Sequence, residues 1–453
     1  MVRFMAETHI SRPFRQKLTN WGVNRHSSGL ILFGARQTGK TILVGELSKK
    51  FRQFIRMDMK DPEDLEVFRR SGAANEFLER LFLLKGKDFA TEDTLIFFDS
   101  VCVDPQVITL AEEILKSYPQ FKIVISSSML LPQVPREFET LFLFPFSFRE
   151  FLAASGNKEA IESFDEVPFP VSGFHKLLGL FHQYALIGGM PSVVSKYVQT
   201  RSLSALKPVY DEILECFFTQ IAGSPFRQGR KDLLTVTLQN SFLYAGTRIK
   251  FNEFGNVPYG SREMAGIFRY LESSLMLSLY YPAIRVIPPV QPDKNKFPRL
   301  QLLDTGLVSY FSGIQKKMIL ATDLNALFKG QVLRHVVGQE LLSTSELMPP
   351  RLDFWVRGKA QSSAEVDYLL DFEGMVIPVT VKSGEPGRLR SLHQFIDEAP
   401  HPFAVRLYAG NVNIRKAVTL RGKPYYLLSL PYFLACRIRE HVGGFITYVG
   451  KSG

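Results

Sequence analysis

The sequence is short of cysteine. Its 453 residues include only three, Cys102, Cys216 and Cys436, and these lie far apart. They have neither the spacing of a zinc site nor the even number of a disulfide framework. Scarce, unpaired cysteines are typical of a reducing compartment, so we expect a cytoplasmic protein.

Long uninterrupted hydrophobic runs are also missing. The most apolar stretch, residues 177–194, is broken by His182, Gln183, two glycines and a proline. It predicts a buried helix followed by a turn, because a membrane span needs about 20 consecutive apolar residues. The first 16 residues contain no apolar segment of the kind found in signal peptides, so we expect no secretory signal.

Acidic residues are fewer than basic ones, 44 against 55, which gives a net charge of +11. The first 150 residues hold 21 basic and 19 acidic side chains, and the remainder holds 34 and 25. A polyanionic partner other than a nucleotide is therefore expected to meet the C-terminal two-thirds. The alternative is a surface whose charge serves solubility.

One short stretch carries the clearest chemical signal. Residues 34–41, GARQTGKT, fit the pattern GxxxxGK[ST] and lie between an apolar strand at 30–33 and an amphipathic helix. Such a loop turns its backbone N–H groups toward a phosphate, with the lysine reaching the β- and γ-phosphates and the threonine binding Mg²⁺. The predicted nucleotide-binding residues are Gly34, Ala35, Arg36, Gln37, Thr38, Gly39, Lys40 and Thr41.

A catalytic carboxylate is missing from the place where ATPases usually have one. The strand LIFFD ends in Asp99, a candidate partner of Mg²⁺ together with Thr41, but the next residue is Ser100. Because a serine is not a general base near neutral pH, we predict ATP binding with slow or absent hydrolysis. Ser127, at the end of the next strand, is the candidate contact to the γ-phosphate or the attacking water. The alternative role for Asp99 is to cap the helix that follows.

Apolar strands alternate with helices over the first 150 residues, which predicts a parallel sheet wrapped by helices. Residues 174–221 have a helical pattern with a break at 188–191, and residues 330–450 return to mixed α/β. The predicted fold class is α/β: a P-loop NTPase sheet, then a helical and winged-helix middle, then a nuclease-like α/β domain. We place these domains at 1–155, 156–325 and 326–453.

The motifs occur in an order that resembles a known family. They are GARQTGKT, IFFDS, VISSSMLL, LFPFSFREFL, ALIGGMPSVV, LQLLDTGLVSYFSG and AEVDYLLDFEGMVIPVTVKSG, spanning residues 30–384. The chain resembles the archaeal and bacterial ATPases that join an AAA-like P-loop domain to a C-terminal DUF4143 domain (the AAA_14 plus DUF4143 architecture). That family usually has Asp-Glu where this chain has Asp99-Ser100. The resemblance also makes Arg136 a candidate γ-phosphate sensor or arginine finger.

The middle of the chain has the sequence pattern of a helix-turn-helix followed by a β-hairpin. Together these elements make a winged helix, which the family resemblance also implies. Residues 223–300 contain 11 basic and 5 acidic side chains. We expect contacts to double-stranded DNA, or else a winged helix used only for packing. The candidate nucleic-acid contacts are Arg262, Arg269, Lys294, Lys296 and Arg299.

Residues 364–382 resemble the PD-(D/E)xK nuclease core, in which two carboxylates and a lysine hold a metal-bound water. Asp367 and Lys382 are in place, but Thr380 stands where the second carboxylate belongs, and Arg334 stands where a helix glutamate is usual. Glu365 is predicted on the face of Asp367 and is the one residue that could restore a metal site. We expect a vestigial nuclease fold that does not cleave, because hard cations need charged oxygen ligands.

Together these patterns predict an ATP-binding switch with cofactors ATP and Mg²⁺, a probable DNA-binding C-terminal half, no membrane partner and a possible oligomer. Two alternatives remain: an active ATP-dependent DNA-processing enzyme, and a protein-interaction scaffold stabilised by ATP.

Overall fold

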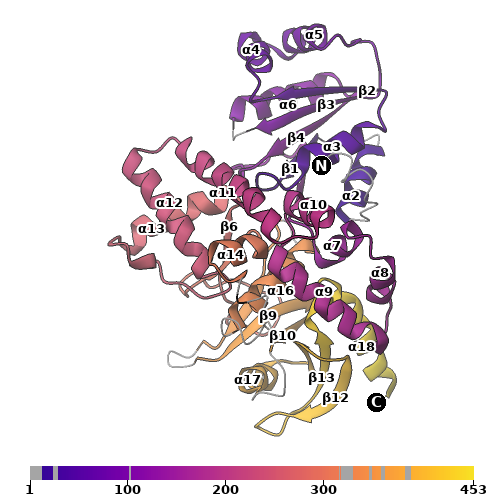
Figure 1. Cartoon of the computed structure of the whole chain (residues 1–453). Helices are drawn as coiled ribbons and strands as arrows, with labels where there is room; N and C mark the ends of the chain where they lie inside the picture. Colours follow the sequence, from indigo (N-terminus) through magenta and orange to yellow (C-terminus); the bar gives the residue numbers. More distant parts are fainter. Residues whose placement is uncertain are drawn as a thin grey trace. The chain divides into compact units, whose positions relative to one another are not determined.

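The computed structural model describes residues 13–23, 29–101, 104–315, 317, 330–345, 349–358, 363–382 and 389–452. Cys102 lies outside these residues. The chain forms two compact units, one of residues 1–144 with Ser273–Met276, the other of Pro145–Glu272 with Leu277–Gly453 (Figure 1). Our three-domain division stays a prediction, since the second unit holds both the helical middle and the C-terminal sheet.

The first unit is built on a five-stranded sheet with the order β2-β3-β4-β1-β5, and every strand pair in it is parallel. Its elements are α2 (Pro13–Val23), β1 (Gly29–Phe33), α3 (Lys40–Ser48), β2 (Gln53–Asp58), α4 (Pro62–Arg70), α5 (Ala74–Leu84), β3 (Thr94–Val101), α6 (Pro105–Ser117), β4 (Phe121–Ser127) and β5 (Phe138–Phe142). This confirms the predicted parallel sheet wrapped by helices.

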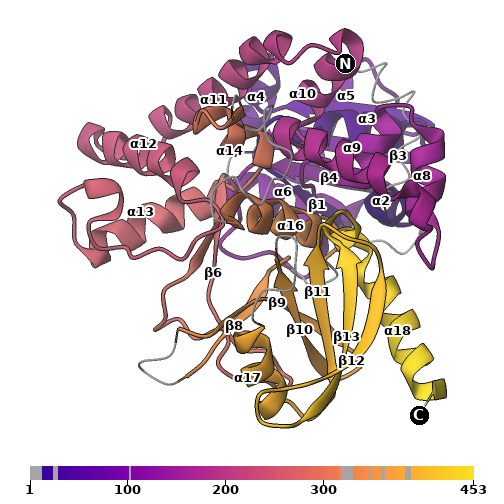
Figure 2. The same ribbon diagram turned by 60° about the horizontal axis from the view of Figure 1, so that its bottom comes forward.

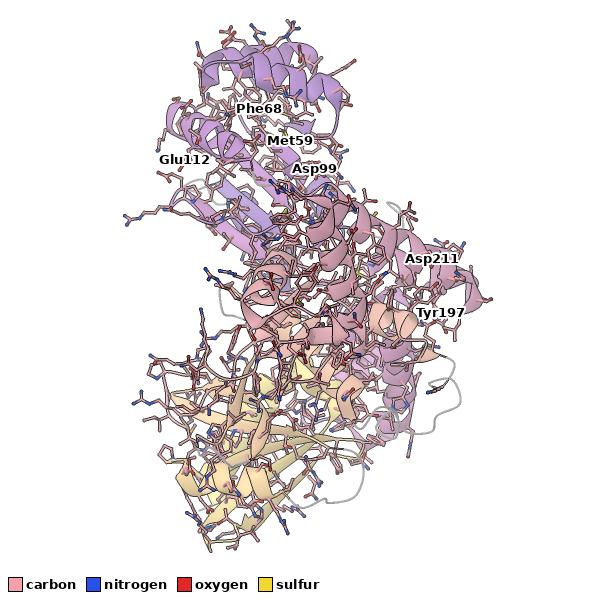
Figure 3. All side chains as sticks on the ribbon, turned by 90° about the vertical axis from the view of Figure 1, so that its left-hand side faces the viewer. Met59, Phe68, Asp99, Glu112, Tyr197 and Asp211 are labelled. Atoms are coloured by element: carbon pink, nitrogen blue, oxygen red, sulfur yellow. The ribbon has the colours of Figure 1, made fainter. Side chains whose placement is uncertain are left out.

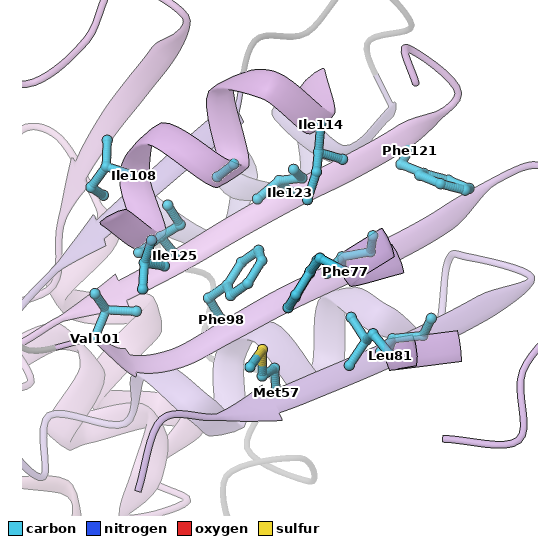
Figure 4. Packing of buried hydrophobic residues seen from close by; sticks show 14 of the residues in the cluster. Met57, Phe77, Leu81, Phe98, Val101, Ile108, Ile114, Phe121, Ile123 and Ile125 are labelled. Atoms are coloured by element: carbon cyan, nitrogen blue, oxygen red, sulfur yellow. The ribbon is translucent and has the colours of Figure 1, made fainter. Parts of the chain in front are cut away.

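Alternate residues of each strand point to opposite faces of this sheet. Helices bury both faces. One face packs against α5 and α6, as Figure 4 shows for Phe98 beside Phe77 and Ile123 beside Ile114. The other face packs against α2 and α3. A sheet covered on both sides explains the near-continuous apolar runs of its strands.

The second unit begins with helices. They are α7 (Phe148–Ala154), α8 (Lys158–Asp165), η1 (Val171–Gly173), α9 (Phe174–Ile187), α10 (Pro191–Thr200), η2 (Ser204–Leu206), α11 (Lys207–Ala222), α12 (Gln228–Leu243), η3 (Phe254–Asn256) and α13 (Ser261–Ser273). An antiparallel hairpin of β6 (Leu277–Tyr280) and β7 (Arg299–Leu302) follows, then α14 (Thr305–Phe311) and α16 (Gln331–Ser343). The predicted break at 188–191 separates α9 from α10.

The unit ends in a six-stranded mixed sheet with the order β12-β13-β11-β10-β9-β8. Its elements are β8 (Asp353–Val356), β9 (Glu365–Phe372), β10 (Met375–Val381), α17 (Arg390–Glu398), β11 (Phe403–Tyr408), β12 (Asn413–Val418), β13 (Pro424–Pro431), η5 (Tyr432–Arg437) and α18 (Ile438–Ser452). Helices α17 and α18 lie on opposite sides of this sheet (Figure 2).

The loop between β6 and β7 is fixed to the edge of the C-terminal sheet. The Ala283 amide donates to the carbonyl of Phe354 at 2.7 Å, and the Val356 amide donates to the carbonyl of Ala283 at 3.0 Å. Ala283 and Val290 also belong to the apolar core that contains Trp355. The base of the hairpin loop is therefore part of the C-terminal core.

Two bulk expectations can be compared with the structure. Among the described residues, neither Cys216 nor Cys436 is in a disulfide. Among the helices that the structure describes, none combines the length and the apolar character needed to span a bilayer.

Candidate functional site

The GARQTGKT loop connects the end of β1 to the start of α3. Its first residue is anchored by the amide of Gly34, which donates to the carbonyl of Ser127 at 3.1 Å. Gln37 (φ 64°) and Gly39 (φ 96°) have left-handed backbone conformations. A Cβ atom on Gly34 would lie 2.7 Å from the carbonyl oxygen of Leu143, so only glycine fits there.

Lys40 arches back across this loop. Its Nζ donates to the carbonyl oxygens of Gly34 at 2.7 Å and Ala35 at 2.8 Å, while the Thr38 hydroxyl donates to Ala35 at 2.9 Å. The ammonium group is thus held over the loop, where the helix start contributes a partial positive charge. The arrangement can bind an anionic phosphate.

Asp99 is brought to the same place by β3. Its side chain is buried, with Oδ2 accepting from the Thr41 hydroxyl at 2.9 Å and Oδ1 accepting from the Ser126 hydroxyl at 2.7 Å. Figure 3 shows Asp99 beside Met59, whose amide donates to the Asp99 carbonyl at 3.0 Å. The structure therefore places Asp99 and Thr41 together, the pair predicted to bind the metal.

The sequence analysis missed a third partner of Asp99. Arg56, on the neighbouring strand β2, places Nε 3.0 Å and one terminal nitrogen 2.7 Å from Asp99 Oδ2. The same terminal nitrogen lies 2.9 Å from Asp58 Oδ2. The signal in the sequence was a lone arginine inside an apolar strand two residues before an aspartate, FIRMD.

These contacts bear on the predicted Mg²⁺ site. Thr41 and Asp99 are the right donor types for a hard cation. However, both Asp99 oxygens already accept hydrogen bonds, and the Arg56 guanidinium supplies a positive charge on the oxygen that faces Thr41. The residues around the loop fit a triphosphate, but they do not fit a divalent cation beside Asp99 while Arg56 keeps this position.

Ser100 occupies a strained position after Asp99. Its φ is 64°, its amide donates to Ser126 Oγ at 2.9 Å, and the pairing of β3 with β4 shifts register between Phe98 and Val101. A left-handed conformation is unusual for serine. The chain therefore bulges where a hydrolytic base would stand.

Two nearby carboxylates, Asp104 and Glu112, make contacts of their own on α6. Asp104 caps α6 by accepting from the Gln106 amide at 2.9 Å. Glu112, farther along α6, interacts with Glu137, and burial together with that like charge raises the pKa of Glu112. The Asp99 contacts found within the described residues come from Thr41, Ser126 and Arg56 and from neither of these side chains.

Two predicted catalytic residues make other side-chain contacts or lie at the other end of β1: Ser127 adjoins the phosphate loop through its backbone, whereas Arg136 precedes the start of the strand. The Ser127 hydroxyl donates to the Met129 carbonyl in its own turn, so Ser126 and not Ser127 faces Asp99. Arg136 precedes Glu137, whose carbonyl accepts from Gly29 at the start of β1, whereas the phosphate loop follows the end of that strand. The chain thus keeps Arg136 away from its own phosphate loop, which corrects the prediction of a γ-phosphate sensor acting within one chain.

The predicted nucleic-acid residues divide into two groups. Arg262 and Arg269 are exposed on α13, Lys294 is exposed on the hairpin loop, and Lys296 is half-buried. Arg299 is only 2% exposed. Its side chain hydrogen-bonds to the carboxylate of Glu365 and to the Asp367 carbonyl, and its guanidinium lies 4.1 Å from the centre of the Phe354 ring. Arg299 therefore cannot contact DNA, which corrects that prediction.

The residues predicted to be remnants of a nuclease site are held by hydrogen bonds and arginines. Asp367 Oδ2 accepts from the Thr380 hydroxyl at 3.1 Å and from the Val381 amide at 2.8 Å, and Arg334 lies 3.8 Å from Oδ1. Lys382 is exposed.

Glu365 does not restore a metal site. Its carboxylate is paired with Arg299 and lies 3.7 Å from Arg248. Within the described parts of the chain, no three His, Cys, Asp or Glu side chains come together as metal ligands. Arginine counter-ions thus occupy the surroundings of both carboxylates.

A buried polar network in the second unit was also missed. Glu340 on α16 is fully buried, and its Oε1 accepts from the Phe148 amide at 2.9 Å and from the Tyr184 hydroxyl at 2.8 Å. Burial raises the pKa of Glu340 to about 7. Because Phe148 begins α7, this carboxyl caps a helix that is far away in sequence. A single acidic residue among apolar helix positions was the available signal.

The network continues to the turn between α9 and α10. Gln339 Nε2 donates to Tyr184 at 2.9 Å and to Asp304 Oδ2 at 3.3 Å, and the Gly189 amide donates to the same Asp304 oxygen at 2.6 Å. Burial raises the pKa of Asp304 to about 6. The motifs PFSFREF, GGMP and LLDTGL therefore meet through side chains and serve the fold of this unit. His182 belongs to packing as well, since its ring contacts Tyr432.

Three family models match successive parts of the chain. Residues 26–152 match a family model described as an AAA domain, residues 178–318 match a domain of unknown function (DUF8612), and residues 329–424 match a domain of unknown function (DUF4143). No curated protein sequence matched the chain.

Several solved structures are similar at low identity. The Walker-type ATPase PABY2304 of Pyrococcus abyssi has 12% identity and a TM-score of 0.41, covering 67% of this chain and 96% of its own. The signal transduction ATPase PH0952 from Pyrococcus horikoshii, with a tetratricopeptide repeat sensor, has 11% identity and a TM-score of 0.29, covering 73% of this chain and 48% of its own. The Drosophila ORC bound to DNA has 13% identity and a TM-score of 0.24, covering 68% and 90%.

The matched domains follow one another in the order that the motifs predict. The chain thus has the predicted architecture, with an AAA domain model matching residues 26–152 and a DUF4143 model matching residues 329–424.

Proposed function

We propose that the first unit binds ATP and hydrolyses it slowly or not at all. The observation that carries this proposal is the phosphate loop with Lys40 held across it, next to an Asp99 that is followed by Ser100. The loop supplies backbone N–H groups and a lysine for the phosphates. A general base is typically worth ~10²–10⁴ in rate, and serine cannot supply one.

Thermal melts with and without ATP test the binding step. A ligand at 100 times its Kd should add about 2.7 kcal/mol to the folded state. We expect this gain in the native chain and its loss in Lys40→Ala. Lys50→Ala, an exposed lysine just beyond α3, is the matched control and should keep the gain. An ATP-induced gain that persists in Lys40→Ala would contradict binding at this loop.

We further propose that the nucleotide acts as a switch on a DNA-binding second unit. The succession of α12, η3, α13 and the β6–β7 hairpin follows the order of a winged helix, and Arg262 and Arg269 are exposed seven residues apart on α13. That spacing puts both guanidinium groups on one helix face. The loop of the hairpin is tied to the C-terminal sheet, so α13 is the element that we expect to meet the phosphates of a duplex.

A gel shift at several salt concentrations tests this second step. Binding to phosphates should weaken as salt rises, and Arg262→Ala/Arg269→Ala should lower the slope of log K against log[salt] by about 2. The double variant Lys158→Ala/Lys451→Ala removes the same charge from exposed positions and should leave the slope unchanged. Salt-independent retention would favour the protein-interaction scaffold. Comparing the native chain with and without ATP tests the switch, which predicts different DNA affinities in the two states.

A further inference from the structure

Asp99 is neutralised from within the chain. Two nitrogens of Arg56 lie 3.0 Å and 2.7 Å from the same Asp99 oxygen, and the guanidinium is also paired with Asp58 at 2.9 Å. The Asp99 side chain is 2% exposed, whereas that of Arg56 is 42% exposed. Arg56 therefore reaches from the surface to the buried carboxylate and is held there by two anions.

The Arg56 guanidinium contacts the carboxylate oxygen that would hold a divalent metal together with Thr41. Asp99 Oδ2, which Arg56 contacts, is also the oxygen that accepts from the Thr41 hydroxyl. A metal held between Thr41 and Asp99 would have to displace the guanidinium or tolerate its positive charge nearby. An arginine stays protonated at every accessible pH, so a change of pH does not remove this competition.

We propose that Arg56 takes the place of the divalent cation at Asp99, so that this chain binds the metal-free nucleoside triphosphate about as well as its magnesium complex. The proposal rests on the proposed function, since it concerns the ligand state of the same phosphate loop. Lys40 and the loop amides hold the phosphates, and Arg56 balances the charge of Asp99. The ordinary arrangement, in which Mg²⁺ strengthens binding through Thr41 and Asp99, is the alternative.

Equilibrium binding of ATP by calorimetry, in excess Mg²⁺ and in EDTA, tests the proposal. The native chain should show Kd values that agree within about 3-fold, which is less than 1 kcal/mol. In Arg56→Gln the freed carboxylate should accept the metal, and Mg²⁺ should tighten ATP binding by about 10-fold or more.

Two further variants act as controls. Arg80→Gln removes an arginine of the same unit that pairs with Glu76 on α5, and it should behave as the native chain does. Arg56→Lys keeps the positive charge and should keep the indifference to Mg²⁺, which covers the case that Arg56→Gln fails to fold.

Each outcome decides between the alternatives. A native chain whose ATP affinity falls 10-fold or more in EDTA overturns the proposal without touching ATP binding itself. An Arg56→Gln variant that remains indifferent to Mg²⁺ also overturns it. A native chain that binds no ATP in either condition refutes the proposed function, and the role of Arg56 with it.

Discussion

The buried carboxyl of Glu340 should make the second unit less stable as the pH rises. Burial raises the pKa of Glu340 from 4.5 to about 7 in the folded state. The folded state therefore holds a proton that the unfolded state releases earlier. The stabilisation from this bound proton is complete below about pH 4.5 and is lost as the pH rises through about 7. Replacing Glu340 by Gln removes the titration while keeping an oxygen to accept from Phe148 and Tyr184.

The size of the effect follows from the pKa difference. The difference between a pKa of 4.5 and one of about 7 corresponds to roughly 3 kcal/mol over the whole window, most of which falls between pH 5 and pH 8. Asp304, with a pKa raised to about 6, contributes in the same direction in both proteins and cancels in the comparison. Between these two pH values Glu340→Gln should therefore lose roughly 2–3 kcal/mol less stability than the parent.

The assay can be directed to the second unit, because the chain has only two tryptophans. Trp21 lies in the first unit and Trp355 is fully buried in the second. In a Trp21→Phe background, urea unfolding followed by tryptophan fluorescence reports on Trp355. Glu162→Gln, on the exposed side of α8, is the control and should keep the parental pH dependence. Equal pH dependence with and without Glu340 would refute the reasoning.

Three other predictions concern the remaining contacts. Arg299→Ala should destabilise the second unit by about 3 kcal/mol or more in urea unfolding, because it leaves Glu365 without its buried partner; a loss below 1 kcal/mol would place Arg299 in a flexible surface role. Ser126→Ala should cost the first unit roughly 1–3 kcal/mol, since it leaves Asp99 Oδ1 and a backbone amide unsatisfied, and Ser127→Ala should cost less; the reverse order would contradict the observed hydrogen bonds. Supercoiled plasmid incubated with the chain and Mg²⁺ or Mn²⁺ should remain intact, and nicking that survives purification and disappears in Asp367→Ala would show a working nuclease.

The sequence predicted the parts of this molecule that depend on local pattern. The alternation of strands and helices and the loop around Lys40 follow from residues close in the chain. Asp61 and Pro62, a residue pair typical of a helix start, cap and begin α4. In each case the physical cause, such as capping or the turn that glycine permits, acts over a few residues.

Contacts between distant segments could not be predicted in the same way. Arg56 meets Asp99 because β2 and β3 pair in parallel with Asp58 opposite Asp99, a register that the sequence does not give. Arg299 seemed to lie on a solvated basic loop, but β9 supplies a carboxylate that draws it into the interior. A charged residue is expected at the surface, but it can be buried where a residue of opposite charge pairs with it.

The measurement that tests the central claim most directly is a single-turnover assay with protein in excess over γ-labelled ATP. We predict that ATP is retained on the native chain and that labelled phosphate is released more slowly than about 10⁻² s⁻¹, a rate reduced by the loss of the base. Release on the order of 1–10 s⁻¹, abolished in Lys40→Ala, would contradict an ATP-holding role and establish an active ATPase.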